Sequence, residues 1–181
     1  MRLGTRSLLY GAHQFILHPI FVLLAWRRVY NGLPLPGSPL TRALVALVHD
    51  WGYWGCHTID GRDGAYHPVI GAGIVRRLTR SDWWYDETLL HSRWFAARQG
   101  RNPSTFCWVD KLSVALMPSW LWASLALLSG EGQEYLNNPR YAQHAPGQRA
   151  TLTALITRHQ LIRKEVGEQM VTIGFLHMEA L

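Results

Sequence analysis

Six histidine and aspartate side chains lie in segments that are otherwise apolar, and each has a residue type that binds metal. The segments read FILHPIF, LVALVHDWG, YHPVIG, LLHSRW and CWVDKLS. The six residues are His18, His49, Asp50, His67, His91 and Asp110. A lone histidine in such a setting is usually a hydrogen-bonded core residue. Burying four imidazoles and two carboxylates is unfavourable unless they are paired or coordinate metal, so the set favours a shared metal centre.

The adjacent pair His49-Asp50 gives this centre its chemistry. Neighbouring helix residues are about 100° apart, so both side chains can reach one point between helices. Asp50 has two oxygens and can bridge two metals, and imidazole with carboxylate suits iron, manganese, zinc or cobalt. Two such ions can clamp a phosphate and make a hydroxide nucleophile from bound water. In the competing interpretation, His49 only ends a helix and Asp50 caps the next turn.

The elements that must position these residues are all predicted to be helices, because strand-like alternation is nearly absent. A Pro/Gly loop, NGLPLPGSP, separates the first two, and Ser38 with Pro39 is typical of a helix start. Helices are predicted at 7–31, from Ser38 to about 55, from His67-Pro68 onward, and at 83–99, 104–117, 118–129 and 148–178. We therefore expect an all-α bundle forming one domain over residues 1–181, with a metal-binding core at about 13–115 and a C-terminal extension at about 116–181.

Composition excludes several classes of protein. The chain is 48% apolar and only 17% charged, which argues against a disordered or coiled-coil protein. Cys56 and Cys107 are too few for a disulfide scaffold or a Cys-rich zinc module, and they fit a reducing, cytoplasmic location. The net charge of +6 has no basic tail behind it, so no specific nucleic-acid partner is indicated, and a small anionic substrate suits the arginines equally well.

Residues 7–26 carry no acid, Lys or Arg, and are long enough to span a membrane. However, His13, Gln14, His18 and Pro19 lie in the middle of this run, and ionisable groups are costly in lipid. We therefore interpret the run as a buried first helix. Peripheral membrane contact through exposed Trp stays open.

The order of these residues resembles the HD-domain superfamily, which is named for its tandem His-Asp. Its pattern is an early His, then HD, then a late Asp on helices of a bundle, and here these are His18, His49-Asp50 and Asp110. The HDxG step ending at Gly52 is also similar, and a Lys follows the late Asp. Members with two metals have two more histidines between, where His67 and His91 stand. HPVIGAGIV resembles a segment of the HD-GYP phosphodiesterases. The resemblance covers about residues 13–115.

The resemblance implies that the ligands are divided between two divalent metal ions. Iron or manganese is expected first, and zinc, cobalt or magnesium are the alternatives. One ion would bind His18, His49, Asp50 and Asp110. Asp50 would bridge to a second ion held by His67 and His91. Two departures matter, because Tyr53 replaces the common HDxGK lysine and RQGRNPS stands near the place of the GYP signature. Cleavage of a cyclic dinucleotide is therefore in doubt.

Most HD proteins are hydrolases, so we expect a metal-dependent phosphohydrolase acting on a small phosphorylated substrate, possibly a nucleotide. Asp50 would be catalytic with Arg93 and Lys111, whose cationic groups would orient the phosphate. The first alternative is a di-iron oxygenase of the myo-inositol oxygenase type, which cleaves a C–C or C–P bond. The second is a non-catalytic HD-fold binding module. The sequence gives no indication of oligomeric state.

Overall fold

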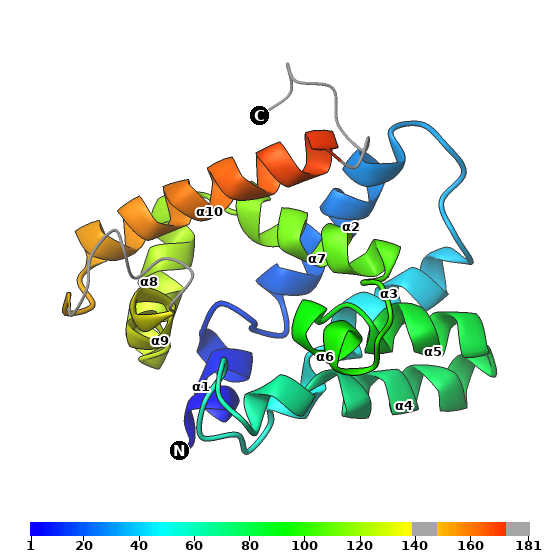
Figure 1. Cartoon of the computed structure of the whole chain (residues 1–181), viewed down its shortest axis with the longest axis horizontal. Coiled ribbons are helices and arrows are strands. Elements are labelled where there is room, and N and C mark those ends of the chain that lie inside the picture. The colour runs from blue at the N-terminus through cyan, green and yellow to red at the C-terminus, as the bar shows by residue number, and fades with distance from the viewer. Residues whose placement is uncertain (139–147, 173–181) are drawn as a thin grey trace.

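The central element of the computed structural model is a helix, α7 (Thr105–Leu116), that other helices contact on several sides. Helices α2 (Leu17–Tyr30), α5 (Asp82–Leu89) and α10 (Leu152–Thr172) all pack against it (Figure 1). The structure describes residues 1–138 and 148–172. Within these ranges the fold is all-α without strands, as predicted. The remaining elements are α1 (Leu3–Tyr10), α3 (Pro39–Val48), η1 (Trp51–Tyr53), η2 (Gly64–Tyr66), α4 (Pro68–Thr79), α6 (Arg93–Arg98), α8 (Ser119–Ser129) and α9 (Gly132–Asn137).

Two apolar clusters hold the bundle together. The larger lies around α2, α3 and α7, where Trp26 stacks on Phe106 with ring centroids 4.9 Å apart. The smaller lies between α8 and α10 and centres on Trp122 and Leu155. Burial of such large side chains is the main stabilising contribution in a fold of this kind. Because α7 is enclosed by these layers, a polar residue on it, such as Asp110, is forced into the interior.

Four helices begin at a serine whose hydroxyl accepts a backbone N–H three residues further on. These are Ser38, Ser81, Ser92 and Ser104. Each satisfies an amide that has no partner within its own helix. The predicted helix start at Ser38 is confirmed, and the unpredicted cap at Ser92 starts a new helix.

The predicted helix at 7–31 is wrong, since it is two helices separated at residues 11–16. The cause is the distant side chain of Glu131. Its carboxylate accepts the backbone N–H of Ala12, and a Cβ added to Gly11 would overlap Oε1 of Glu131. The bond to this carboxylate replaces the next helical hydrogen bond, so the chain turns before α2 begins.

Three other predicted boundaries also need correction. The helix from Ser38 ends at Val48 rather than near 55, and the helix predicted at 83–99 is divided into α5 and α6 around His91. Helix α9 lies where a loop was predicted. The last predicted helix, at 148–178, corresponds to α10, which begins at Leu152 and extends to Thr172. Residues 173–178 of that prediction lie outside the described residues. The first two breaks fall beside His49 and His91.

No single helix in the described ranges combines the length and the apolar composition needed to cross a membrane. Helices α7 and α8 meet that test only as a pair, and the pair is bent by 99° at its break.

His159, which no sequence pattern explained, fixes α10 to the bundle. Its Nε2 lies 2.8 Å from the carbonyl of Val114, its Nδ1 lies 3.0 Å from the hydroxyl of Ser119, and its ring stacks on Trp122. Because a carbonyl only accepts, Nε2 carries the proton and Nδ1 accepts from the hydroxyl. Burial lowers the pKa of His159 to about 4.

This pKa predicts acid sensitivity. Between pH 6.5 and about 4 the unfolded chain protonates His159 while the folded chain does not, so stability falls as the pH falls through this window. We expect a loss of about 2 kcal/mol between pH 7 and pH 5 from this residue. Denaturant unfolding of the wild type and His159→Gln at both pH values measures it. The variant should have a lower free energy of unfolding at pH 7, but this free energy should fall less between pH 7 and pH 5 than that of the wild type. An equal fall in the two proteins would contradict the lowered pKa of His159.

Candidate metal centre

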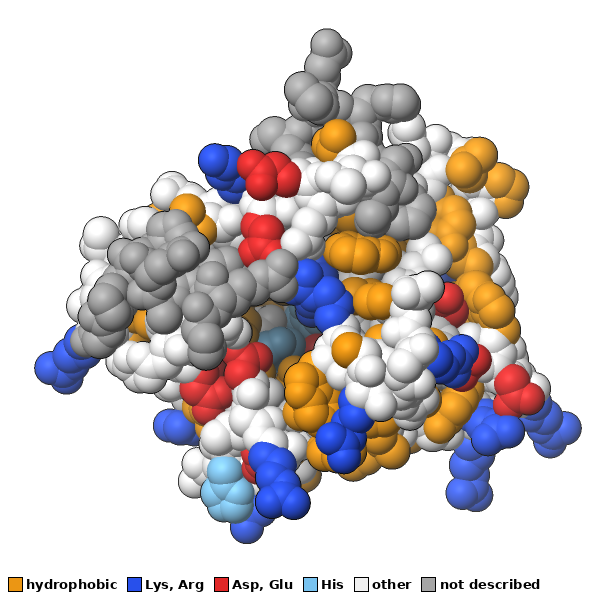
Figure 2. Space-filling view, in the orientation of Figure 1, with side chains coloured by type: hydrophobic (Ala, Val, Ile, Leu, Met, Phe, Trp, Pro, Cys, Tyr) orange, Lys and Arg blue, Asp and Glu red, His pale blue; other side chains and the backbone are white. Residues whose placement is uncertain are grey.

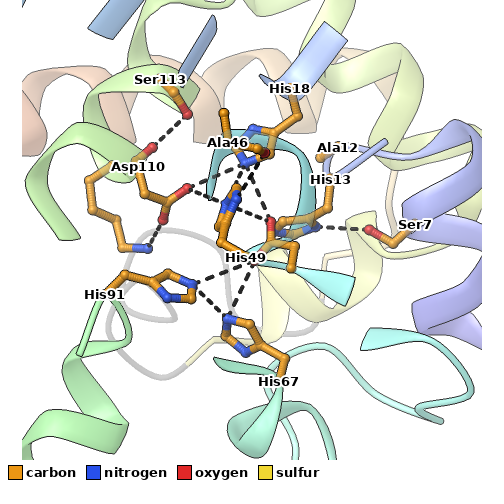
Figure 3. Close-up of polar contacts among 12 residues, drawn as sticks. Ser7, Ala12, His13, His18, Ala46, His49, His67, His91, Asp110 and Ser113 are labelled. Atoms are coloured by element: carbon orange, nitrogen blue, oxygen red, sulfur yellow. Dashed lines mark hydrogen bonds and ion pairs between the residues drawn. The ribbon is translucent and has the colours of Figure 1, made fainter. Parts of the chain in front are cut away.

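The structure brings the six predicted residues together from five separate segments. His18 lies in the first turn of α2, His49 directly follows α3, and Asp50 comes before η1. The others are His67, which directly precedes α4, His91 in the turn between α5 and α6, and Asp110 on α7. All six side chains are buried. Figure 3 shows the side chains of His18, His49, His67, His91 and Asp110 pointing toward one another. Their donor atoms form two groups, each lying within 4.8 Å.

The first group contains His18, His49, Asp50 and Asp110. Oδ2 of Asp50 lies 3.3 Å from Nε2 of His18 and 3.2 Å from Nε2 of His49. Oδ1 of Asp110 lies 3.4 Å and 3.6 Å from the same two nitrogens. Ligands about 2.1 Å from one ion are roughly 3.0 to 3.4 Å from each other. The four atoms therefore have the spacing of a metal's ligand set.

The second group contains His67, His91 and the other oxygen of Asp50. Oδ1 of Asp50 lies 3.4 Å from Nε2 of His67 and 3.6 Å from Nε2 of His91. Asp50 thus places one oxygen in each group. This is the arrangement of a carboxylate that bridges two ions.

Backbone carbonyls fix which ring nitrogen of three histidines carries the proton. Nδ1 of His49 faces the carbonyls of Val45 and Ala46, Nδ1 of His67 faces that of Gly64, and Nδ1 of His91 faces that of Thr88. A carbonyl accepts only, so each Nδ1–H donates and each Nε2 keeps its lone pair in the neutral ring. Nε2 of His67 and Nε2 of His91 are only 2.9 Å apart. Two lone pairs this close repel, and a cation between them removes the repulsion.

The electrostatics of the cluster also favour a cation. Burial alone would lower the pKa of His49, but the neighbouring carboxylates of Asp50 and Asp110 raise it to about 10. Burial and then His91 hold the pKa of His67 well below its ordinary value, so this ring stays neutral. Oδ2 of Asp50 is buried and, within the described ranges, accepts no well-aligned hydrogen bond. The site therefore combines two buried carboxylates with a neutral His67, and the proton on His49 supplies a positive charge that a divalent metal ion would replace.

A cavity of about 300 Å³ opens onto this cluster. Figure 2 shows it as a hollow with histidine at its floor, basic side chains on one rim and acidic ones on the other. The predicted residues Arg93 and Lys111 both line it, as do Tyr53 and Trp94. The ring of Tyr53 stacks on His67 with centroids 4.0 Å apart and holds that ligand in place.

The two predicted cationic residues are held differently. Nζ of Lys111 lies 2.9 Å from Oδ2 of Asp110, which leaves the Oδ1 oxygen of that carboxylate for the first group. Arg93 reaches across to α10 and donates to Gln169 at 3.3 Å. Arg101, by contrast, forms a bidentate pair with Asp86 and does not line the cavity.

A second pair beside the cluster, the half-buried His13 and the buried Glu131, was not predicted from the sequence. Nδ1 of His13 lies 3.4 Å from Oε2 of Glu131, and Ser7 and Ser129 also donate to this carboxylate. His13 lines the cavity. Burial opposes its protonation, but the carboxylate of Glu131 and those of the cluster raise its pKa above the ordinary value. Because 118 positions separate the pair, no local sequence pattern pointed to it.

Comparison of the chain with protein-family models, curated proteins and solved structures found no match. The candidate metal centre therefore depends on its geometry alone.

Proposed function

We propose that the protein is a metal-dependent phosphohydrolase of the HD-domain superfamily. One observation carries the proposal: Asp50 directs its two oxygens into two adjacent donor groups, each completed by neutral or paired histidines. His18, His49, Asp50 and Asp110 would hold one ion, and Asp50, His67 and His91 the other. Two ions bound there would supply a water nucleophile near neutral pH and neutralise charge on a phosphate.

The other residues of the cavity fit an anionic substrate. Arg93 lies on the cavity wall, where its guanidinium can hold two phosphate oxygens at once. Lys111 adds a second positive charge. Burial opposes its protonation, but the adjacent carboxylate of Asp110 raises the pKa of Lys111 above its ordinary value and keeps it protonated. The limited volume excludes a macromolecular substrate from the floor of the cavity and favours a small phosphate ester.

His13 is placed to donate the proton that a leaving group needs. Its Nδ1 faces Ser7 and Glu131, so the rest of the ring is turned to the cavity side. The carboxylate of Glu131 and those of the cluster raise the pKa of this ring above its ordinary value, which favours the protonated form that a proton donor needs. A proton donor of this kind typically accelerates the breaking of an ester bond by 10²- to 10⁴-fold.

The decisive experiment combines metal analysis with phosphate release. The purified protein is analysed for bound metal and then assayed with manganese, iron or cobalt on phosphomonoesters, phosphodiesters and nucleotides. Metal-dependent release of phosphate supports the proposal. Two irons with oxygen consumption on a substrate would favour the oxygenase alternative instead, and failure to bind metal would favour a binding module.

Arg93→Met tests the substrate contact. Loss of a charged hydrogen-bond donor should raise KM about tenfold or more, with a smaller change in kcat. Arg101→Met is the matched control, because this arginine pairs with Asp86 away from the cavity. Steady-state kinetics on the best substrate should leave the control unchanged. If both variants behave alike, Arg93 does not bind the phosphate.

A further inference from the structure

The first 49 residues contain five arginines and no acidic residue. The arginines are Arg2, Arg6, Arg27, Arg28 and Arg42. The next acid, Asp50, is buried in the metal cluster. Helices α1, α2 and α3 therefore contribute positive charge to the surface and no negative charge of their own.

Helix α2 also carries an exposed apolar stripe. Ile16, just before the helix, and Ile20 and Leu24 within it are 70%, 48% and 47% exposed. Residues four apart lie on one helix face, so the three form a continuous line. The opposite face, with Val22, Ala25 and Trp26, is buried. The stripe ends at the exposed residues Arg27 and Arg28.

A second stripe follows α3, which packs against α2. It runs from Leu40, which is 81% exposed, through Leu47 to Trp51. The ring of Trp51 lies edge-on to Phe15 at 5.9 Å, which joins the end of this stripe to the start of the first. We call the combined surface of Ile16, Ile20, Leu24, Leu40, Leu47 and Trp51 the α2–α3 face.

We propose that the α2–α3 face binds the surface of an anionic lipid bilayer. Aliphatic side chains with a tryptophan at the edge and arginines beside them are the composition of an interfacial membrane contact. The charge decides against a second copy of the chain. A symmetric dimer through this face would bring two acid-free, arginine-bearing surfaces together, whereas anionic headgroups supply the opposite charge.

A second exposed indole, Trp54, follows three residues after Trp51 and is 59% exposed. Nη1 of Arg2 donates to the carbonyl of the next residue, Gly55. Exposed indoles and guanidinium groups suit the headgroup layer, where the ring lies among the acyl-chain ends and the cation meets phosphate. The inference does not depend on the reaction catalysed at the metal centre.

Vesicle co-sedimentation tests the proposal with the full chain. Vesicles of phosphatidylcholine alone are compared with vesicles containing about one third phosphatidylglycerol. We expect binding to the mixed vesicles only, weakened by high salt. The double variant Ile20→Ser/Leu47→Ser should lower the binding constant about tenfold or more, and Arg27→Glu about fivefold or more. Trp83→Ser is the control, since this exposed aromatic on α5 follows Asp82 and lies outside the face.

Circular dichroism checks that each variant is folded, which is expected because all the changed side chains are exposed. Equal binding of the double variant and the control would overturn the proposal. Failure of the wild type to bind mixed vesicles at low salt would overturn it as well. Sedimentation equilibrium showing a dimer that the double variant dissociates would assign the face to a second copy instead.

Discussion

Replacing Asp50 by alanine should remove both metal ions at once. The wild type is expected to bind about two ions per chain, and Asp50→Ala close to none. Asp50 is the one residue that belongs to both donor groups, so its replacement removes an oxygen from each of them. Activity on any substrate should fall about 10³-fold or more, since both nucleophile generation and charge neutralisation depend on the ions. Elemental analysis after removal of loosely bound metal measures the stoichiometry.

His91→Ala provides the comparison that makes the result specific. His91 belongs only to the second group, so its loss should release mainly one ion and leave the first group of four donors complete. A cluster that is merely a hydrogen-bonded core would give no such difference between the variants. Retention of two ions or of full activity in Asp50→Ala would contradict the bridging role.

The spacing of chemical groups in the sequence was enough to predict which side chains meet. His49-Asp50 at the end of an apolar helix, His67 before another and Asp110 on a third all follow from local patterns, and the structure places them in one cluster. The patterns did not predict the local backbone structure at each of these residues. His91 was expected inside a helix but stands in a turn, because Ser92 caps a new helix immediately after it.

Long-range contacts explain the remaining errors. The break before α2 depends on Glu131, which captures the backbone of Ala12 from 119 positions away. Hydrophobic periodicity carries no information about a partner so distant in sequence. The same carboxylate holds His13 at the cavity, and Gln169 on α10 accepts from Arg93. Residues after 116, which the sequence left without a role, therefore help to build the site.

Two glycines of α4 should respond oppositely to the same substitution. Gly71 packs against the end of α3, where an added Cβ would lie 2.5 Å from the carbonyl oxygens of both Val48 and His49. Gly73, two residues later, has nothing within 4 Å of the same position. Alanine favours a helix over glycine by about 0.5–1 kcal/mol. Gly73→Ala should therefore be stabilising by about that amount.

Gly71→Ala gains the same helix propensity but must push α4 away from α3, and we expect a net destabilisation of about 2 kcal/mol. The shift also separates His67, at the start of α4, from Asp50, which follows α3, so the second ion should bind more weakly. Denaturant unfolding in the presence of a chelator isolates the packing effect, and metal titration of the folded variants measures the effect on the site. Gly73→Ala is the matched control, because it makes the same substitution in the same helix. An unaffected Gly71→Ala would contradict the close packing of α4 against α3, and a destabilised Gly71→Ala that binds metal as the wild type does would show that this packing does not position His67.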